Sequence, residues 1–184
     1  TEQDVTEQII KTLKIGSYDI ISVRVLRDSV DAHRRGSIVR CISAAVSLRG
    51  EKRFIGMKNV EKYKPYCYEY PAASRLKLRP VIVGSGPAGL FCALILASCG
   101  AQPIVLERGS DVDTRVKKVS SFFKNGILDP KCNIQFGEGG AGTFSDGKLN
   151  TGTRDPRQKK VLEEFVRHGA PEDILTNAKP HIGT

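Results

Sequence analysis

The feature that most constrains the fold is a glycine pattern, Gly-Ser-Gly-Pro-Ala-Gly, at residues 84–89. A short apolar run, Pro80 to Val83, precedes it, and a longer apolar stretch, Pro87 to Ser98, follows it. This order predicts a strand, a tight turn and a helix. A second apolar run, Pro103 to Leu106, predicts a parallel strand after the helix. The segment therefore reads as a βαβ unit of the Rossmann-like α/β class.

Each position of the pattern suits a site for a pyrophosphate. Gly84 permits a tight turn, Gly86 lets a backbone approach the phosphates, and Gly89 lets the helix pack closely on the strand. Pro87 fits the first helical turn, where its missing N–H is not needed, and the helix start offers free amides to an anion. The predicted pyrophosphate-binding residues are Gly84, Ser85, Gly86, Pro87, Ala88 and Gly89.

An acidic residue ends the second predicted strand. Glu107 lies 18 residues after Gly89, about the spacing at which a carboxylate meets the ribose hydroxyls of a dinucleotide. We expect Glu107 to accept hydrogen bonds from the ribose and Arg108 to flank the adenine. The competing interpretation is a glycine-rich turn with an unrelated surface glutamate.

A second glycine-rich stretch, Gly137 to Gly147, bears on which dinucleotide is bound. NAD and FAD both present adenosine diphosphate to a βαβ unit, so the first glycines are compatible with either. A second loop of flexible backbone and hydroxyls can wrap a pyrophosphate or approach a flat ring, which favours FAD. The alternative is a mobile surface loop. The additional predicted cofactor contacts are Gly139, Gly140, Gly142, Thr143 and Ser145.

The residues before the βαβ unit predict a separate domain. Helical spacing of apolar residues predicts a helix over Asp4 to Leu13, and Val- and Ile-rich runs predict strands over Ile20 to Leu26 and Ile38 to Leu48. We therefore expect a small α+β domain at 1–60. A stretch rich in Tyr, Lys and Pro, 61–79, is the predicted linker.

The remainder, 80–184, is predicted to be the N-terminal part of an FAD/NAD(P)-binding domain with two further helices. The first covers Asp111 to Lys124, with Val112, Val116, Val119 and Phe123 as its apolar face, and the second covers Arg157 to His168.

Charge and cysteine content limit the other classes of function. The net charge is +9, of which residues 1–79 carry +7. A basic front module could recruit an acidic partner or RNA. The basic residues are scattered and not interleaved with aromatics, so nucleic acid is not expected.

The five cysteines include no Cys-x-x-Cys pair, so neither a zinc site nor a disulfide framework is indicated, and a reducing compartment is expected. No apolar run is long enough to predict a membrane span.

Two longer stretches carry a family resemblance. Residues 79–109 resemble the N-terminal FAD fingerprint of glutathione-reductase-like flavoproteins. A run from Asn133 to Leu149, supported by Asp111, Arg115 and Leu128-Asp129-Pro130, resembles a little-characterised family of FAD-dependent dehydrogenases from bacteria and plant plastids. Pro180 to Thr184 is also similar to that family. So is Ser29 to Arg34, although His33 stands where family members carry Arg.

The resemblance implies FAD as cofactor and a flavin-dependent oxidoreductase acting on a small-molecule substrate, with NAD(P)H as a candidate electron partner. It implies a bacterial cytoplasm or a plastid stroma as the location. It also implies that this chain is an N-terminal fragment, inactive alone, because family members continue into a substrate domain. An NAD-dependent enzyme using the same βαβ unit is the alternative.

Overall fold

The computed structural model describes residues 1–33, 36–71 and 76–182. The chain divides into two compact units: Thr1–Tyr68 together with residues 148–182, and Glu69–Gly147. Each unit combines helices with a small sheet, so the expected mixed α/β class is confirmed.

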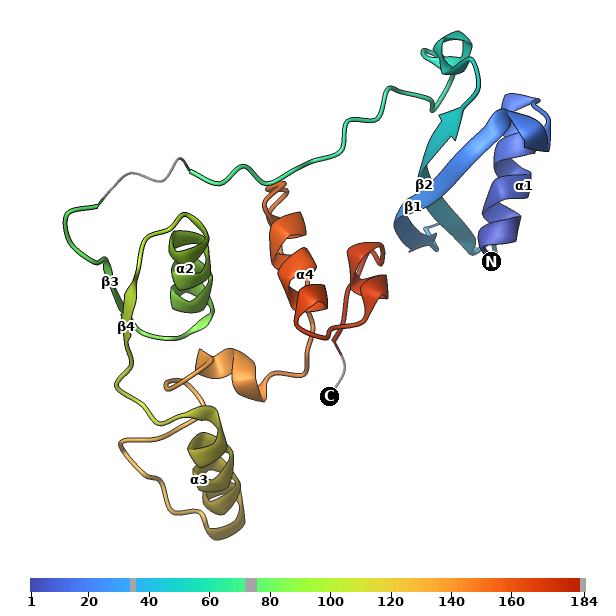
Figure 1. Ribbon diagram of the computed structural model, residues 1–184. Coiled ribbons are helices and arrows are strands. Elements are labelled where there is room, and N and C mark those ends of the chain that lie inside the picture. Colours follow the sequence, from blue (N-terminus) through green and yellow to red (C-terminus); the bar gives the residue numbers. More distant parts are fainter. Residues whose placement is uncertain (34–35, 72–75, 183–184) are drawn as a thin grey trace. The chain divides into compact units, whose positions relative to one another are not determined.

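A long hairpin dominates the first unit. Helix α1 (Glu2–Leu13) lies alongside an antiparallel pair, β1 (Ile20–Asp31) and β2 (Val39–Leu48) (Figure 1). Strand β1 runs five residues beyond its predicted end at Leu26, because the mostly polar run Arg27 to Asp31 also pairs with β2. The predicted turn from Asp31 to Gly36 includes residues 34 and 35, which lie outside the described residues.

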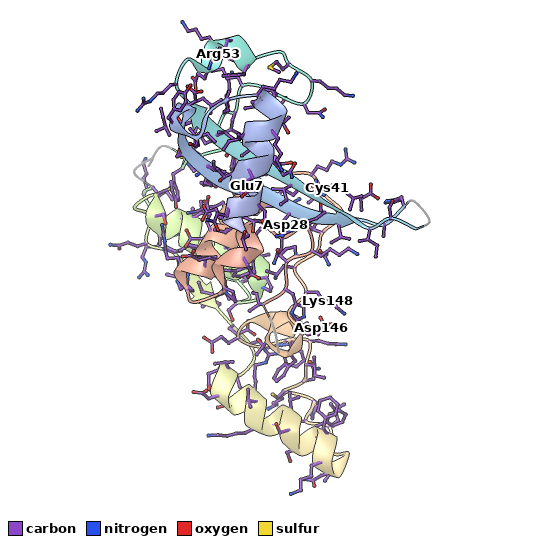
Figure 2. All side chains as sticks on the ribbon, turned by 90° about the vertical axis from the view of Figure 1, so that its right-hand side faces the viewer. Glu7, Asp28, Cys41, Arg53, Asp146 and Lys148 are labelled. Atoms are coloured by element: carbon purple, nitrogen blue, oxygen red, sulfur yellow. The ribbon has the colours of Figure 1, made fainter. Side chains whose placement is uncertain are left out.

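The hairpin carries a third backbone partner from the far end of the chain. Asp28 of β1, labelled in Figure 2, donates its N–H to the carbonyl of Thr176 at 2.8 Å and accepts the N–H of Ala178 at 2.9 Å. This C-terminal segment follows helix α4 (Gln158–Arg167) and the 3-10 turn Glu172–Leu175. Ile174, the most deeply buried apolar residue of the unit, anchors that turn.

The remaining elements of the first unit are short. Single 3-10 turns occupy Ser17–Asp19, before the hairpin, and Glu51–Phe54, after it. The described part of the predicted linker, 61–71 and 76–79, contains neither helix nor strand. None of the described helices combines the length and apolarity needed to cross a membrane.

The second unit contains the predicted βαβ arrangement. Strands β3 (Val81–Val83) and β4 (Ile104–Leu106) are parallel and in register, and α2 (Pro87–Ser98) connects them. Their bounds agree with the sequence predictions to within one residue. Helix α3 (Val112–Asn125) follows, and the chain then runs back along it to the 3-10 helix Gly140–Phe144 (Figure 1).

Helix α3 does not bury the face predicted from its sequence. Arg115 and Val119 are buried, whereas Val116 and Phe123 are 46% and 70% exposed. The prediction assumed that the most apolar stripe would face the interior. The returning segment instead covers the stripe that contains Arg115, because the guanidinium is held there by backbone carbonyls.

Candidate functional site: two glycine loops joined at their backbones

The first glycine turn has the geometry that its residues require. Gly84 has a φ of +96°, a left-handed conformation that favours glycine, and its N–H donates to the carbonyl of Leu106 at 2.7 Å. A Cβ on Gly89 would lie 2.0 Å from the Gly84 carbonyl oxygen. The turn therefore excludes any larger residue at position 89 and seats the helix directly on β3.

The start of α2 is open toward an incoming group. Gly86 is its N-cap and provides no capping side chain, and Pro87 occupies the first turn. Across residues 1–33, 36–71 and 76–182, no acceptor is found for the N–H groups of Ala88 and Gly89. Two free amides at the positive end of a helix dipole form a binding position for an anion.

Glu107 connects the end of β4 to the first turn. Its Oε2 accepts the N–H of Ser85 at 2.7 Å and the Ser85 hydroxyl at 3.0 Å, and its Oε1 accepts the N–H of Gly109 at 2.7 Å. Hydrogen bonds from the backbone of Ser85 and then of Gly109 lower the pKa of the Glu107 carboxyl to about 2. Glu107 is therefore ionised at neutral pH and keeps acceptor capacity for a further hydroxyl.

The second glycine loop docks on the first turn through its backbone. The N–H of Gly139 donates to the carbonyl of Ser85 at 2.9 Å. A Cβ on Gly140 would lie 3.2 Å from the Cα of Gly86 and 3.2 Å from Cδ of Pro87. Gly139 and Gly140 both have positive φ values, +79° and +62°. The structure thus brings the two glycine-rich segments into one site, where their backbones are in contact.

Two of the predicted hydroxyl contacts are used within the second loop. The Thr143 hydroxyl donates to the carbonyl of Glu138 at 3.1 Å, and the Ser145 hydroxyl accepts the N–H of Gly147 at 3.2 Å. Gly142 precedes both of them, and a Cβ at this position would lie 3.7 Å from Cγ of Pro87. Gly142 therefore adjoins the first turn, whereas the two hydroxyls shape the loop.

Arg108 lies beside the site and is exposed. Its guanidinium carbon stands 4.5 Å from the centre of the Phe136 ring, the geometry of a cation–π contact. The predicted role beside an adenine is thus compatible with a side chain already held on one aromatic face.

Sequence reasoning gave Arg115 no functional role. It has no exposed surface, and it donates hydrogen bonds to three carbonyls and one hydroxyl of the segment that becomes the second loop. One signal was present in the sequence: Arg115 falls three residues after Val112 and four before Val119, on a stripe that otherwise would be apolar. A charge placed there has to find buried partners.

Among the described side chains, no group of three or more His, Cys, Asp or Glu residues is arranged to hold a metal ion. The site therefore consists of backbone amides, one carboxylate and the glycine loops.

Comparison with known proteins points to the same segment. Residues 77–119, which contain β3, α2, β4 and Glu107, match the family model described as FAD binding domain. This match supports FAD as the cofactor of the βαβ unit. The chain is also 40% identical over 189 residues to an uncharacterized protein of Clostridium beijerinckii, covering 97% of this chain and 34% of that protein. The chain thus spans about a third of the length of this relative.

Proposed function

We propose that this chain is the FAD-binding portion of a flavin-dependent oxidoreductase of the dehydrogenase type, with the fingerprint of glutathione-reductase-like flavoproteins. The observation that carries the proposal is the hydrogen-bonded unit of Ser85, Glu107 and Gly109 beside the free amides of Ala88 and Gly89. In this unit the ionised carboxylate of Glu107, which can accept hydrogen bonds from hydroxyl groups, lies next to amides that can bind an anion. A ribose joined to a pyrophosphate presents those two groups together.

The residues present fit the adenosine diphosphate half of FAD. The pyrophosphate would lie at the N–H groups of Ala88 and Gly89, and the ribose hydroxyls would donate to Glu107. The second glycine loop would form the opposite wall, where a Cβ on Gly140 would lie only 3.2 Å from Gly86 and Pro87. FAD, when bound, supplies a flavin ring that accepts two electrons and releases them to a second substrate.

We further propose that the rest of a longer protein completes this domain. Val81, Val83 and Leu106 of the two-stranded sheet are 56%, 85% and 53% exposed. Parallel sheets are normally buried on both faces, so additional strands and helices are needed to cover them. In this proposal the present chain does not catalyse by itself, and a small-molecule substrate and NAD(P)H bind to the completed enzyme.

The proposed location is a bacterial cytoplasm, or a plastid stroma if the source is a plant. The support is the cysteine usage, since all five cysteines are free thiols in the structure and both compartments are reducing.

The test is to purify the full-length protein that contains this chain and identify its bound cofactor. We expect a yellow protein that releases FAD on denaturation. Glu107→Gln should weaken FAD binding at least about tenfold, since a side-chain amide cannot accept from all three donors. Glu61→Gln, an exposed position in the predicted linker, is the matched control and should bind as wild type does.

A colourless protein that takes up no added FAD would overturn the proposal. Release of a nicotinamide dinucleotide without flavin would favour the NAD-dependent alternative instead.

A further inference from the structure

The most deeply buried charge in the second unit belongs to Arg115. Its side chain has no exposed surface, and its Nη1 donates to the Glu138 carbonyl and, at 3.1 Å, to the Thr143 hydroxyl. Its Nη2 donates to the carbonyls of Ile134 at 3.1 Å and Asn133 at 3.4 Å. One side chain of α3 therefore holds both ends of the segment that leads into and forms the second glycine loop.

The charge of Arg115 is balanced without a carboxylate. In the portion of the chain that the structure describes, the guanidinium has no ion pair with an Asp or Glu, and its hydrogen bonds go to carbonyls and one hydroxyl. Carbonyl dipoles and the face of Phe144, 5.0 Å from the guanidinium carbon, surround it instead. Its Nε has no hydrogen-bond partner. A buried cation neutralised only by dipoles leaves a positive potential around it, which favours an anion nearby.

The loop is shaped closely around this side chain. A Cβ on Gly137 would lie 2.5 Å from Cδ of Arg115, and Gly137 has a φ of +110°. Two residues later, Gly139 donates to the Ser85 carbonyl of the first turn. An uninterrupted series of contacts therefore leads from Arg115 through the loop to the proposed pyrophosphate position.

We infer that Arg115 is a positioning residue for the dinucleotide pyrophosphate: it fixes the Gly137–Phe144 loop against the first glycine turn and contributes positive potential there. The inference rests on the proposed function, since it needs a dinucleotide at this site. Arg115 acts through the loop and does not touch the ligand. Its loss should therefore weaken binding of the pyrophosphate and spare the ribose contact made by Glu107.

The experiment compares three ligands on the full-length protein after its cofactor has been removed. FAD and ADP carry the pyrophosphate, whereas adenosine reports on the ribose site alone. Arg115→Met should raise the dissociation constants of FAD and ADP at least about tenfold, as expected for loss of charge-assisted hydrogen bonds. Adenosine should bind within about twofold of wild type. Lys117→Met removes an exposed cation from the same helix and should leave the dissociation constants of all three ligands unchanged.

Two further variants keep the inference testable if Arg115→Met does not fold. Arg115→Lys retains the charge but loses the planar guanidinium, so the affinity for FAD and ADP should fall by an intermediate amount. Thr143→Val removes one hydrogen-bond partner of Arg115 on the loop. This variant should bind ADP more weakly and should bind adenosine as wild type does.

Each result has one meaning. A wild-type protein that binds neither FAD nor ADP would overturn the proposed function itself. Wild-type binding together with unchanged FAD and ADP affinities in the Arg115 variants would overturn the inference alone. Equal losses of affinity for ADP and adenosine in Arg115→Lys and Thr143→Val would also overturn the inference, because Arg115 would then only maintain the fold.

Discussion

Replacing Glu107 by Gln tests the electrostatic centre of the site. A pKa lowered from 4.5 to about 2 corresponds to about 3 kcal/mol between the ionised and protonated forms. Because the carboxylate is partly exposed, about 2 kcal/mol is the more realistic contribution at neutral pH. The amide of a glutamine would place a donor against the N–H of Ser85 or of Gly109, so this contribution should be lost.

Hydrogen exchange of those two amides measures the effect directly. At pH 7 the protection of Ser85 and Gly109 should fall about 30-fold in Glu107→Gln, the equivalent of about 2 kcal/mol. The folded pKa lies below the unfolded one, so the stabilisation is fully present above about pH 4.5 and is lost as pH falls toward 2. The amide protection of wild type and of Glu107→Gln should therefore become equal as the pH approaches 2. Equal protection at pH 7 would refute the argument that the carboxylate holds this turn.

Two other predictions concern packing. Gly89→Ala should abolish FAD binding and lower the melting temperature, because its Cβ would lie 2.0 Å from a backbone oxygen, whereas Gly152→Ala, with nothing within 4 Å, should change neither. In α4, Lys160→Met alone should cost about 3 kcal/mol, because the buried Glu164 carboxylate would keep only the largely exposed Arg167, 3.3 Å away, as an ion-pair partner. The double variant Lys160→Met/Glu164→Leu should recover part of that loss in urea denaturation, and strictly additive costs would contradict the pairing.

The local structure of the βαβ unit was predictable because its signals are local. Gly84, Pro87 and the apolar runs beside them specify turn, helix start and strands within a few residues of one another. The bounds of α2 follow directly from Pro87 at its first position and Gly100 soon after its end. The glycine turn alone does not distinguish FAD from NAD, so residues farther along the chain are needed. The match of residues 77–119 supports FAD.

The contacts between distant segments were not predictable in the same way. Nothing local to Asp28 indicates that Thr176 to Ala178 will pair with it, because exposed strand edges accept many sequences. The docking of Gly139 on Ser85 joins residues more than fifty positions apart through backbone atoms, so the glycines of both segments could be recognised in the sequence but their pairing could not. The contacts of individual residues with FAD remain predictions, although the structure places most of those residues together.

Arg115 combines a local sequence signal with contacts between distant segments. The sequence marked an arginine on a stripe of α3 that otherwise would be apolar, and burial of a charge needs compensating partners. The structure supplies those partners as carbonyls of a glycine loop, which glycine makes accessible because no Cβ shields the backbone. An aspartate or glutamate partner would have neutralised the cation, whereas carbonyls leave its field in place. A protein that binds a doubly charged pyrophosphate benefits from that arrangement, so the missing carboxylate is itself consistent with the proposed ligand.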